Sequence, residues 1–113
     1  METKRKTFLM KIVCVQGLGF VGSAMAVAIA SGNKNLKVIG LEKNNERGKD
    51  IINKINYGKL PFTTEDKNLV KEFKKCSKNK KIIATVDQKV IKDVDVIVSN
   101  INLDLNFKKK NRM

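Results

Sequence analysis

A glycine-rich run between a strand-like and a helix-like segment constrains the fold of this chain more than any other feature. Gly17-Leu18-Gly19-Phe20-Val21-Gly22 has the spacing G-x-G-x-x-G. The segment before it, residues 8–16, is apolar and rich in β-branched side chains, and residues 20–31 carry small side chains and no charge. The acidic Glu42 follows 20 positions after Gly22. A strand, a glycine turn, a helix and an acid in this order are typical of a dinucleotide-binding βαβ unit.

Each part of the glycine motif has a physical task in such a unit. Gly17 permits the tight turn off the strand, and Gly19 lets the backbone come close to a pyrophosphate because it has no Cβ. Gly22 lets the helix pack closely on the sheet, while the free N–H groups at the start of the helix attract phosphate. The predicted cofactor-binding residues of the turn are Gly17, Leu18, Gly19, Phe20, Val21 and Gly22.

Glu42 is predicted to select the cofactor. At the end of the second strand its carboxylate would accept hydrogen bonds from the adenosine ribose, and its charge would repel a 2′-phosphate. The sequence therefore predicts NAD rather than NADP, a preference that the nearby Lys43 and Arg47 moderate.

Strand-like and helix-like segments alternate along the rest of the chain. The pattern predicts strands at residues 8–16, 36–42, 81–86 and 94–101, helices at 20–31, 44–57 and 65–76, and one or two helical turns within 87–93. Thr63 or Thr64 is the predicted cap of the last helix. Strands joined by helical crossovers form parallel sheets. We predict an α/β fold, a Rossmann-like doubly wound parallel sheet of about four strands over residues 8–105, with basic tails at 1–7 and 106–113.

The strong positive charge does not by itself indicate a nucleic-acid partner. The chain has 24 Lys and Arg against 11 Asp and Glu, for a net charge of +13. Nearly all of the basic residues are Lys, and aromatic residues make up only 5% of the chain. Proteins that read nucleic acids rely more on Arg forks and stacking aromatic rings. We therefore expect no nucleic-acid partner, and a basic interaction protein is an alternative that a steep salt dependence of DNA binding would support.

Residues 12–31 carry no charge and follow Lys4-Arg5-Lys6, so they imitate a signal peptide or a membrane segment. Gln16 and the glycines interrupt that segment, and its division into strand, turn and helix favours a soluble fold.

The chain contains no His, which excludes His-dependent triads and His-ligated metals. Cys14 and Cys76 are too far apart in sequence for a zinc knuckle and are expected to be buried, non-catalytic thiols in a reducing cytoplasm. We predict no metal site and no catalytic residue in this chain.

Five segments together resemble a known family. These segments are VCVQGLGFVGSAMA, VIGLEKN followed by Arg47, INYGKLPF, IIATVD and VDVIVSNI, over roughly residues 9–102. In this order they resemble the N-terminal part of the UDP-glucose/GDP-mannose dehydrogenases, the nucleotide-sugar 6-dehydrogenases. The glycine motif is shared with other dehydrogenases, including the 3-hydroxyisobutyrate type, which stays an alternative. The G-K-x-P and A-T-x-D segments are more particular to the resembled family.

The resemblance implies further residues and a reaction. It adds Arg47 at the adenosine end of NAD and Thr85 at the end of the third strand, near the cofactor. Where the family usually has Thr-Pro after its fourth strand, this chain has Asn100-Ile101-Asn102-Leu103-Asp104. Family members oxidise the C6 alcohol of a UDP- or GDP-sugar to a carboxylate, with catalytic groups downstream of the matched segment.

The resemblance also implies that the chain is an incomplete domain. We expect a truncated cofactor domain that ends after its fourth strand, leaves an apolar sheet edge and is inactive alone. The complete enzyme would bind a nucleotide sugar and form a homodimer. A stand-alone dinucleotide-binding module is the second alternative.

Overall fold

The structure is a computed structural model that describes residues 11–99. The predicted tails at 1–7 and 106–113, the segment Asn100 to Asp104, and the outer ends of the first and last predicted strands lie outside the described residues.

Within residues 11–99, four parallel strands form one sheet, which confirms the predicted α/β class. The strands are β1 (Lys11–Gln16), β2 (Leu36–Leu41), β3 (Ile82–Thr85) and β4 (Val96–Ser99). Their order is β3-β2-β1-β4. The central strand β1 reads as a nearly continuous apolar run because its neighbours and the helical layer bury it.

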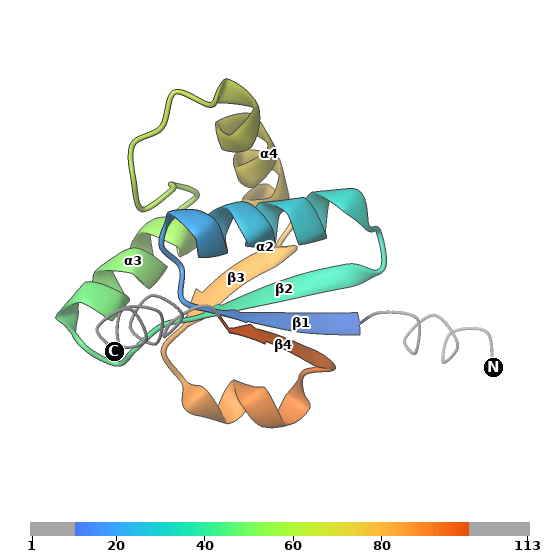
Figure 1. Cartoon of the computed structure of the whole chain (residues 1–113), viewed down its shortest axis with the longest axis vertical. Coiled ribbons are helices and arrows are strands. Elements are labelled where there is room, and N and C mark those ends of the chain that lie inside the picture. Colours follow the sequence, from blue (N-terminus) through green and yellow to red (C-terminus); the bar gives the residue numbers. More distant parts are fainter. Residues whose placement is uncertain (1–10, 100–113) are drawn as a thin grey trace, which may run out of the picture.

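The helices divide between the two faces of the sheet (Figure 1). They are α2 (Phe20–Gly32), α3 (Glu46–Asn56), α4 (Lys67–Lys78) and the short 3₁₀ helix η1 (Gln88–Asp93). The three α-helices lie on one face, and η1 crosses on the other. From β1 the chain first adds β2 and β3 on one side and then adds β4 on the other side, so the direction in which the sheet grows reverses between β1 and β4. In open α/β sheets ligands bind at such a point, outside the carboxyl ends of the strands. The glycine turn leaves β1 at this point.

The core lies between the sheet and the α-helices. Its largest fully buried side chains are Phe73, Leu18, Leu41, Ile55, Val15 and Val38. Ile55 of α3 and Phe73 of α4 are the inward-facing side chains of two helices with one apolar face each. In the described part of the chain β4 is an edge strand, and its exposed Val96 and Ile97 match the predicted apolar edge.

Side chains from distant elements complete the ends of the sheet and of α2. The amide of Asn56 pairs with the edge strand β3 at Ala84, since its Nδ2 donates to the Ala84 carbonyl and its Oδ1 accepts from the Ala84 N–H, both at 2.8 Å. The Lys81 ammonium donates to the carbonyls of Ala30 and Asn33, where α2 ends without a basic residue of its own. A cation there offsets the negative end of the helix dipole.

The predicted cap of the last helix was wrong. α4 begins at Lys67, and the side chain of Asp66, rather than Thr63 or Thr64, accepts a hydrogen bond from the Leu69 N–H at 3.0 Å. Thr64 instead accepts from the Asp66 N–H at 3.1 Å, which fixes the capping residue. An aspartate satisfies a free helical N–H better than a threonine and adds a negative charge at the positive helix end.

Replacing Asp66 by alanine is expected to lower the free energy of unfolding by about 1 kcal/mol, the usual effect of losing an N-cap. Thr63→Ala is the matched control, because Thr63 is exposed and caps nothing in the described structure. Urea unfolding of both variants measures the difference. Equal midpoints for the two variants would contradict the assignment of the cap.

Candidate functional site

The glycine turn has the backbone geometry that its sequence demands. Gly17 has a φ of 90°, a left-handed conformation that side chains disfavour. Its N–H donates to the Leu41 carbonyl at 2.9 Å, so the turn stays attached to the end of β2. The chain then enters α2 at Phe20, directly after Gly19.

Leu18 anchors the turn in the core. Its side chain is only 1% exposed, and a Cβ added at Gly40 of β2 would lie 2.7 Å from its methyl groups. The Leu18 carbonyl accepts a hydrogen bond from the buried Ser23 hydroxyl at 2.9 Å. Leu18 therefore serves the predicted site by fixing the turn, and sequence reasoning missed the parts that Gly40 and Ser23 play in this.

The start of α2 differs from the starts of the other two α-helices. α3 and α4 each have a side-chain cap, Asn45 and Asp66. α2 has Gly19 at its N-cap position and no side-chain cap, and within residues 11–99 a Cβ added at Gly19 would meet no atom within 4 Å apart from its chain neighbours. Free N–H groups, the positive end of a 13-residue helix and open space for an approaching group are the features that anion sites at helix starts use. This geometry fits a pyrophosphate.

Glu42 brings three strand ends together beside that helix start. Its Oε2 accepts from the Leu18 N–H at 2.7 Å, and its Oε1 accepts from the Lys43 N–H at 3.2 Å. The Glu42 N–H donates to the Thr85 carbonyl at 3.0 Å. The half-buried carboxylate has lone pairs left for two ribose hydroxyls, since it can accept about four hydrogen bonds.

Thr85 and Arg47 lie on the two elements next to Glu42, Thr85 on the neighbouring strand β3 and Arg47 on the helix α3 that follows in the chain. Thr85 ends β3, and its hydroxyl accepts from the Asp87 N–H at 3.0 Å, which shapes the chain leaving the sheet. Arg47 is exposed on the first turn of α3, which follows Glu42 by a short loop. Its side chain stays a predicted contact for the adenosine end.

Gly48 is a site-supporting residue that sequence reasoning missed. A Cβ at this position would lie 1.9 Å from the Lys43 carbonyl oxygen, so α3 can start this close to the Glu42 loop only with glycine here. The available signal was a glycine in the first turn of a helix, since glycine inside a helix costs about 1 kcal/mol and usually has a packing reason.

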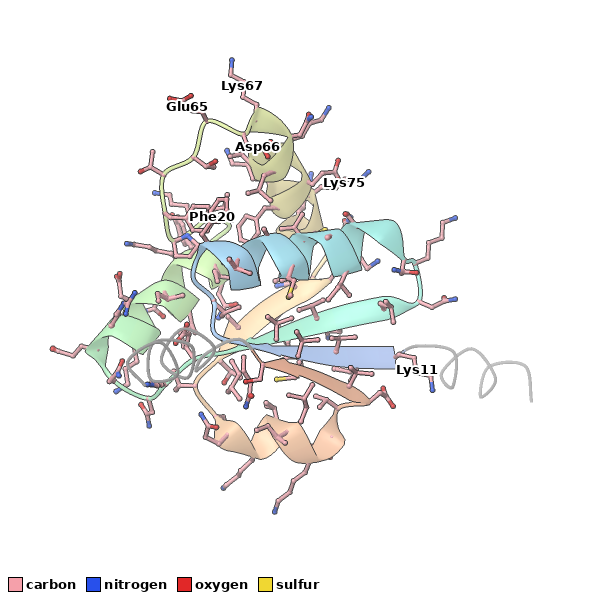
Figure 2. All side chains as sticks on the ribbon, viewed as in Figure 1. Lys11, Phe20, Glu65, Asp66, Lys67 and Lys75 are labelled. Carbon is pink, nitrogen blue, oxygen red and sulfur yellow. The ribbon has the colours of Figure 1, made fainter. Side chains whose placement is uncertain are left out.

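Phe20 and Val21 have exposed side chains at the start of α2, 59% and 60% respectively. Figure 2 shows Phe20 at the end of α2 that faces the segment between α3 and α4. Its ring makes an edge-to-face contact with Phe62, with centroids 5.1 Å apart. Gly22, the third residue of α2, is buried, which agrees with its predicted packing role.

The two cysteines are buried, Cys14 in β1 and Cys76 in α4. Both are free and buried, and burial raises the pKa of the Cys14 thiol and, together with the nearby Glu72, of the Cys76 thiol, although Lys81 and Lys75 oppose the second shift. In the described part of the chain, no group of three or more His, Cys, Asp or Glu could hold a metal ion. Among the helices of residues 11–99, none is long and apolar enough to cross a membrane.

Comparisons with known proteins agree with this geometry. The family profile described as UDP-glucose/GDP-mannose dehydrogenase family, NAD binding domain, matches residues 10–109. Comparison with curated proteins gave no significant match.

Among solved structures, the chain is similar to an NDP-N-acetyl-D-galactosaminuronic acid dehydrogenase from Methanosarcina mazei Go1, with a TM-score of 0.74 and 27% identity. The match covers 85% of this chain and 22% of that one. The fold is also similar to a GDP-mannose dehydrogenase from Pseudomonas aeruginosa, with a TM-score of 0.66, 24% identity, and coverage of 79% and 19%.

A UDP-glucose dehydrogenase from Pyrobaculum islandicum shares the fold as well, with a TM-score of 0.67, 18% identity, and coverage of 81% and 20%. The chain thus spans about a fifth of the length of each of these structures. The matched profile covers nearly the whole sequence and describes the cofactor domain. The chain therefore belongs to the UDP-glucose/GDP-mannose dehydrogenase family, as its NAD-binding domain.

Proposed function

We propose that the chain holds NAD beside the glycine turn and the end of β2. The uncapped start of α2, with open space at Gly19, is the observation that carries this proposal. The pyrophosphate would take the free N–H groups of Gly19, Phe20 and Val21, while Gly17, Leu18 and Gly22 fix the turn. Glu42 would accept hydrogen bonds from the adenosine ribose, with Arg47 and Thr85 beside it.

We further propose that this site serves a nucleotide-sugar 6-dehydrogenase that oxidises the C6 alcohol of a UDP- or GDP-sugar to a uronate. Membership of the family and the similarity to the Methanosarcina mazei enzyme support this proposal. Bound NAD supplies the hydride acceptor for such an oxidation. The residues of this chain bind and orient that acceptor, and the nucleotide sugar, a homodimeric assembly and a cytoplasmic location belong to the proposed whole enzyme.

A thermal melt of the chain with NAD, with NADP and without cofactor tests the binding proposal. NAD at a hundredfold excess over its dissociation constant should stabilise the folded chain by about 2.7 kcal/mol. We expect a cooperative transition that NAD raises more than NADP does. A transition that neither nucleotide moves would contradict the proposed site.

Replacing Glu42 is expected to weaken NAD binding and narrow the preference over NADP. Glu42→Ala removes an acceptor of charge-assisted hydrogen bonds, each contributing about 1.5–3 kcal/mol, so NAD affinity should fall roughly tenfold or more. Glu42→Gln keeps an oxygen that can accept from the Leu18 N–H but removes the charge, so it isolates the repulsion of the 2′-phosphate. Fluorescence titrations with NADH and NADPH give both affinities. An unchanged ratio of the two affinities in Glu42→Gln would refute the selecting role of the charge.

A further inference from the structure

The start of α2 has no side-chain cap, but its first residue makes an aromatic contact. Phe20, the first residue of the helix, meets Phe62 edge-to-face at a centroid distance of 5.1 Å and an interplanar angle of 64°. This geometry is one of the favoured arrangements of two aromatic rings. Phe62 lies in the segment 58–65 between α3 and α4. Within residues 11–99, this is the one pair of aromatic rings in contact.

The segment that carries Phe62 is fixed at both ends. At its start, Gly58 has a φ of 89°, and the Lys59 N–H donates to the Lys54 carbonyl at 2.8 Å as α3 ends. Leu60 then packs against the core. At its end, the hydrogen bond from the Asp66 N–H to Thr64 leads into the capped start of α4. Phe62 is therefore presented to Phe20 by a well-anchored loop.

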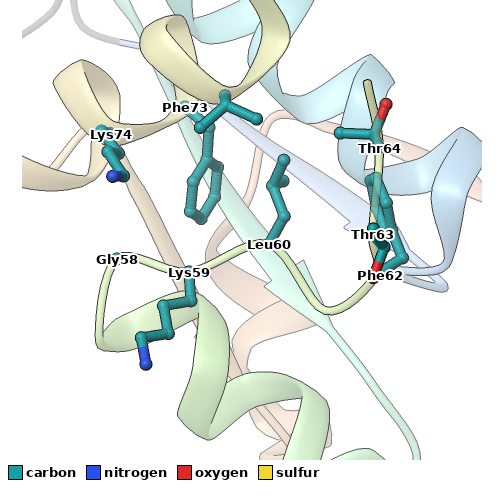
Figure 3. A pocket seen from close by; sticks show the side chains of 9 residues that line it. Gly58, Lys59, Leu60, Phe62, Thr63, Thr64, Phe73 and Lys74 are labelled. Atoms are coloured by element: carbon teal, nitrogen blue, oxygen red, sulfur yellow. The ribbon is translucent and has the colours of Figure 1, made fainter. Parts of the chain in front are cut away.

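A cavity of about 270 Å³ lies beside Phe62, lined in addition by Leu60 and Phe73 (Figure 3). The ring is half-buried, so its position depends on the anchored loop and on Phe20 rather than on tight packing from every side. Shortening Phe62 would remove the contact with Phe20 without opening a sealed core.

A helix start without a cap frays, because its first N–H groups have no partners. α2 cannot use a side-chain cap, since the N–H groups that a cap would occupy are those proposed to receive the pyrophosphate. We propose that Phe62 is a positioning residue that replaces the cap. Its ring holds Phe20 in place, keeps the first turn of α2 ordered, and so aims the free N–H groups at the dinucleotide. This inference rests on the proposed NAD site and adds to it a loop outside the glycine motif.

The test combines amide hydrogen exchange with cofactor affinity in the full chain. Phe62→Ala should speed the exchange of the amides of residues 20–23 in the cofactor-free chain and leave the start of α4 unchanged. It should also weaken NADH binding about threefold to tenfold, the range expected from the loss of one aromatic pair. Phe62→Tyr, which keeps the ring, should restore both properties.

Two controls separate positioning from general stability. Tyr57→Ala removes an aromatic side chain that is 80% exposed near the same loop and does not touch Phe20, so affinity should not change. In a Phe20→Ala background, Phe62→Ala should have no further effect on affinity, because the ring acts through Phe20. A lower melting temperature with unchanged affinity and exchange at residues 20–23 would overturn the inference while leaving the NAD site standing. A parent chain that binds no NADH would overturn both.

Discussion

Replacing Gly19 by leucine is expected to abolish NAD binding while leaving the chain folded. Gly19 has a φ of −71° and a ψ of −157°, a backbone conformation open to other residues, and a Cβ there would meet no described atom within 4 Å. The free energy of unfolding should therefore change by no more than about 0.5 kcal/mol. The leucine side chain would instead fill the space through which a pyrophosphate approaches the start of α2, so the stabilisation of about 2.7 kcal/mol by excess NAD should disappear.

Gly32→Leu is the matched control for this experiment. Gly32 ends the same helix on the side away from the glycine turn, and an added Cβ there also meets open space. Thermal melts with and without NAD should show the normal shift for Gly32→Leu and none for Gly19→Leu. A normal NAD-dependent shift in Gly19→Leu would show that the dinucleotide binds elsewhere.

Replacing Gly48 by alanine is expected to lower the stability of the chain strongly, whereas the change at Gly19 affects NAD binding and leaves stability nearly unchanged. The added Cβ would lie 1.9 Å from the backbone oxygen of Lys43, and a backbone atom cannot rotate away as a side chain can. Overpacking of this kind costs about 3 kcal/mol at the upper end of its usual range. For a domain of this size the melting temperature should fall by roughly 12–24 °C.

Gly32→Ala serves as the control, because the same substitution at an unobstructed helical position should cost nothing. A shift of Lys43 would also displace Glu42, the residue before it, which is proposed to bind the adenosine ribose. Those Gly48→Ala molecules that remain folded should therefore bind NAD more weakly. Differential scanning calorimetry and an NADH titration measure the two effects. A melting temperature within about 2 °C of the parent would mean that α3 can shift at little cost, which would contradict a tight contact between Gly48 and Lys43.

Local patterns were sufficient for most of the fold. The strands, the three α-helices and the short η1 were predicted within a few residues of their observed bounds, because apolar periodicity and glycine turns are encoded in neighbouring residues. The error at the start of α4 has the same origin. Thr63, Thr64 and Asp66 are all capping residue types, and only the path of the loop decides which of them meets the Leu69 N–H.

The candidate site divides in the same way. The glycine turn, Glu42 and the helix after them were predicted from spacing, since a βαβ unit brings these residues together over a short stretch of chain. The supports of the site were not predicted. Gly40 beneath Leu18 and Phe62 against Phe20 depend on how separate elements pack, and a single sequence contains no local signal that pairs them. Gly48 against Lys43 depends on the path of the short loop before α3, which the glycine alone does not specify.

The sequence by itself determined the parallel α/β class, the position of the glycine turn and the acid beside it, because each is a local requirement of backbone conformation or charge. The tertiary structure alone decided which helix start stays uncapped and open, and which distant side chains stabilise its surroundings. The hydrogen bonds of Asn56 to Ala84 and of Lys81 to the end of α2, and the ring contact of Phe62 with Phe20, join residues that are far apart in the sequence, so they depend on how the folded chain closes its loops.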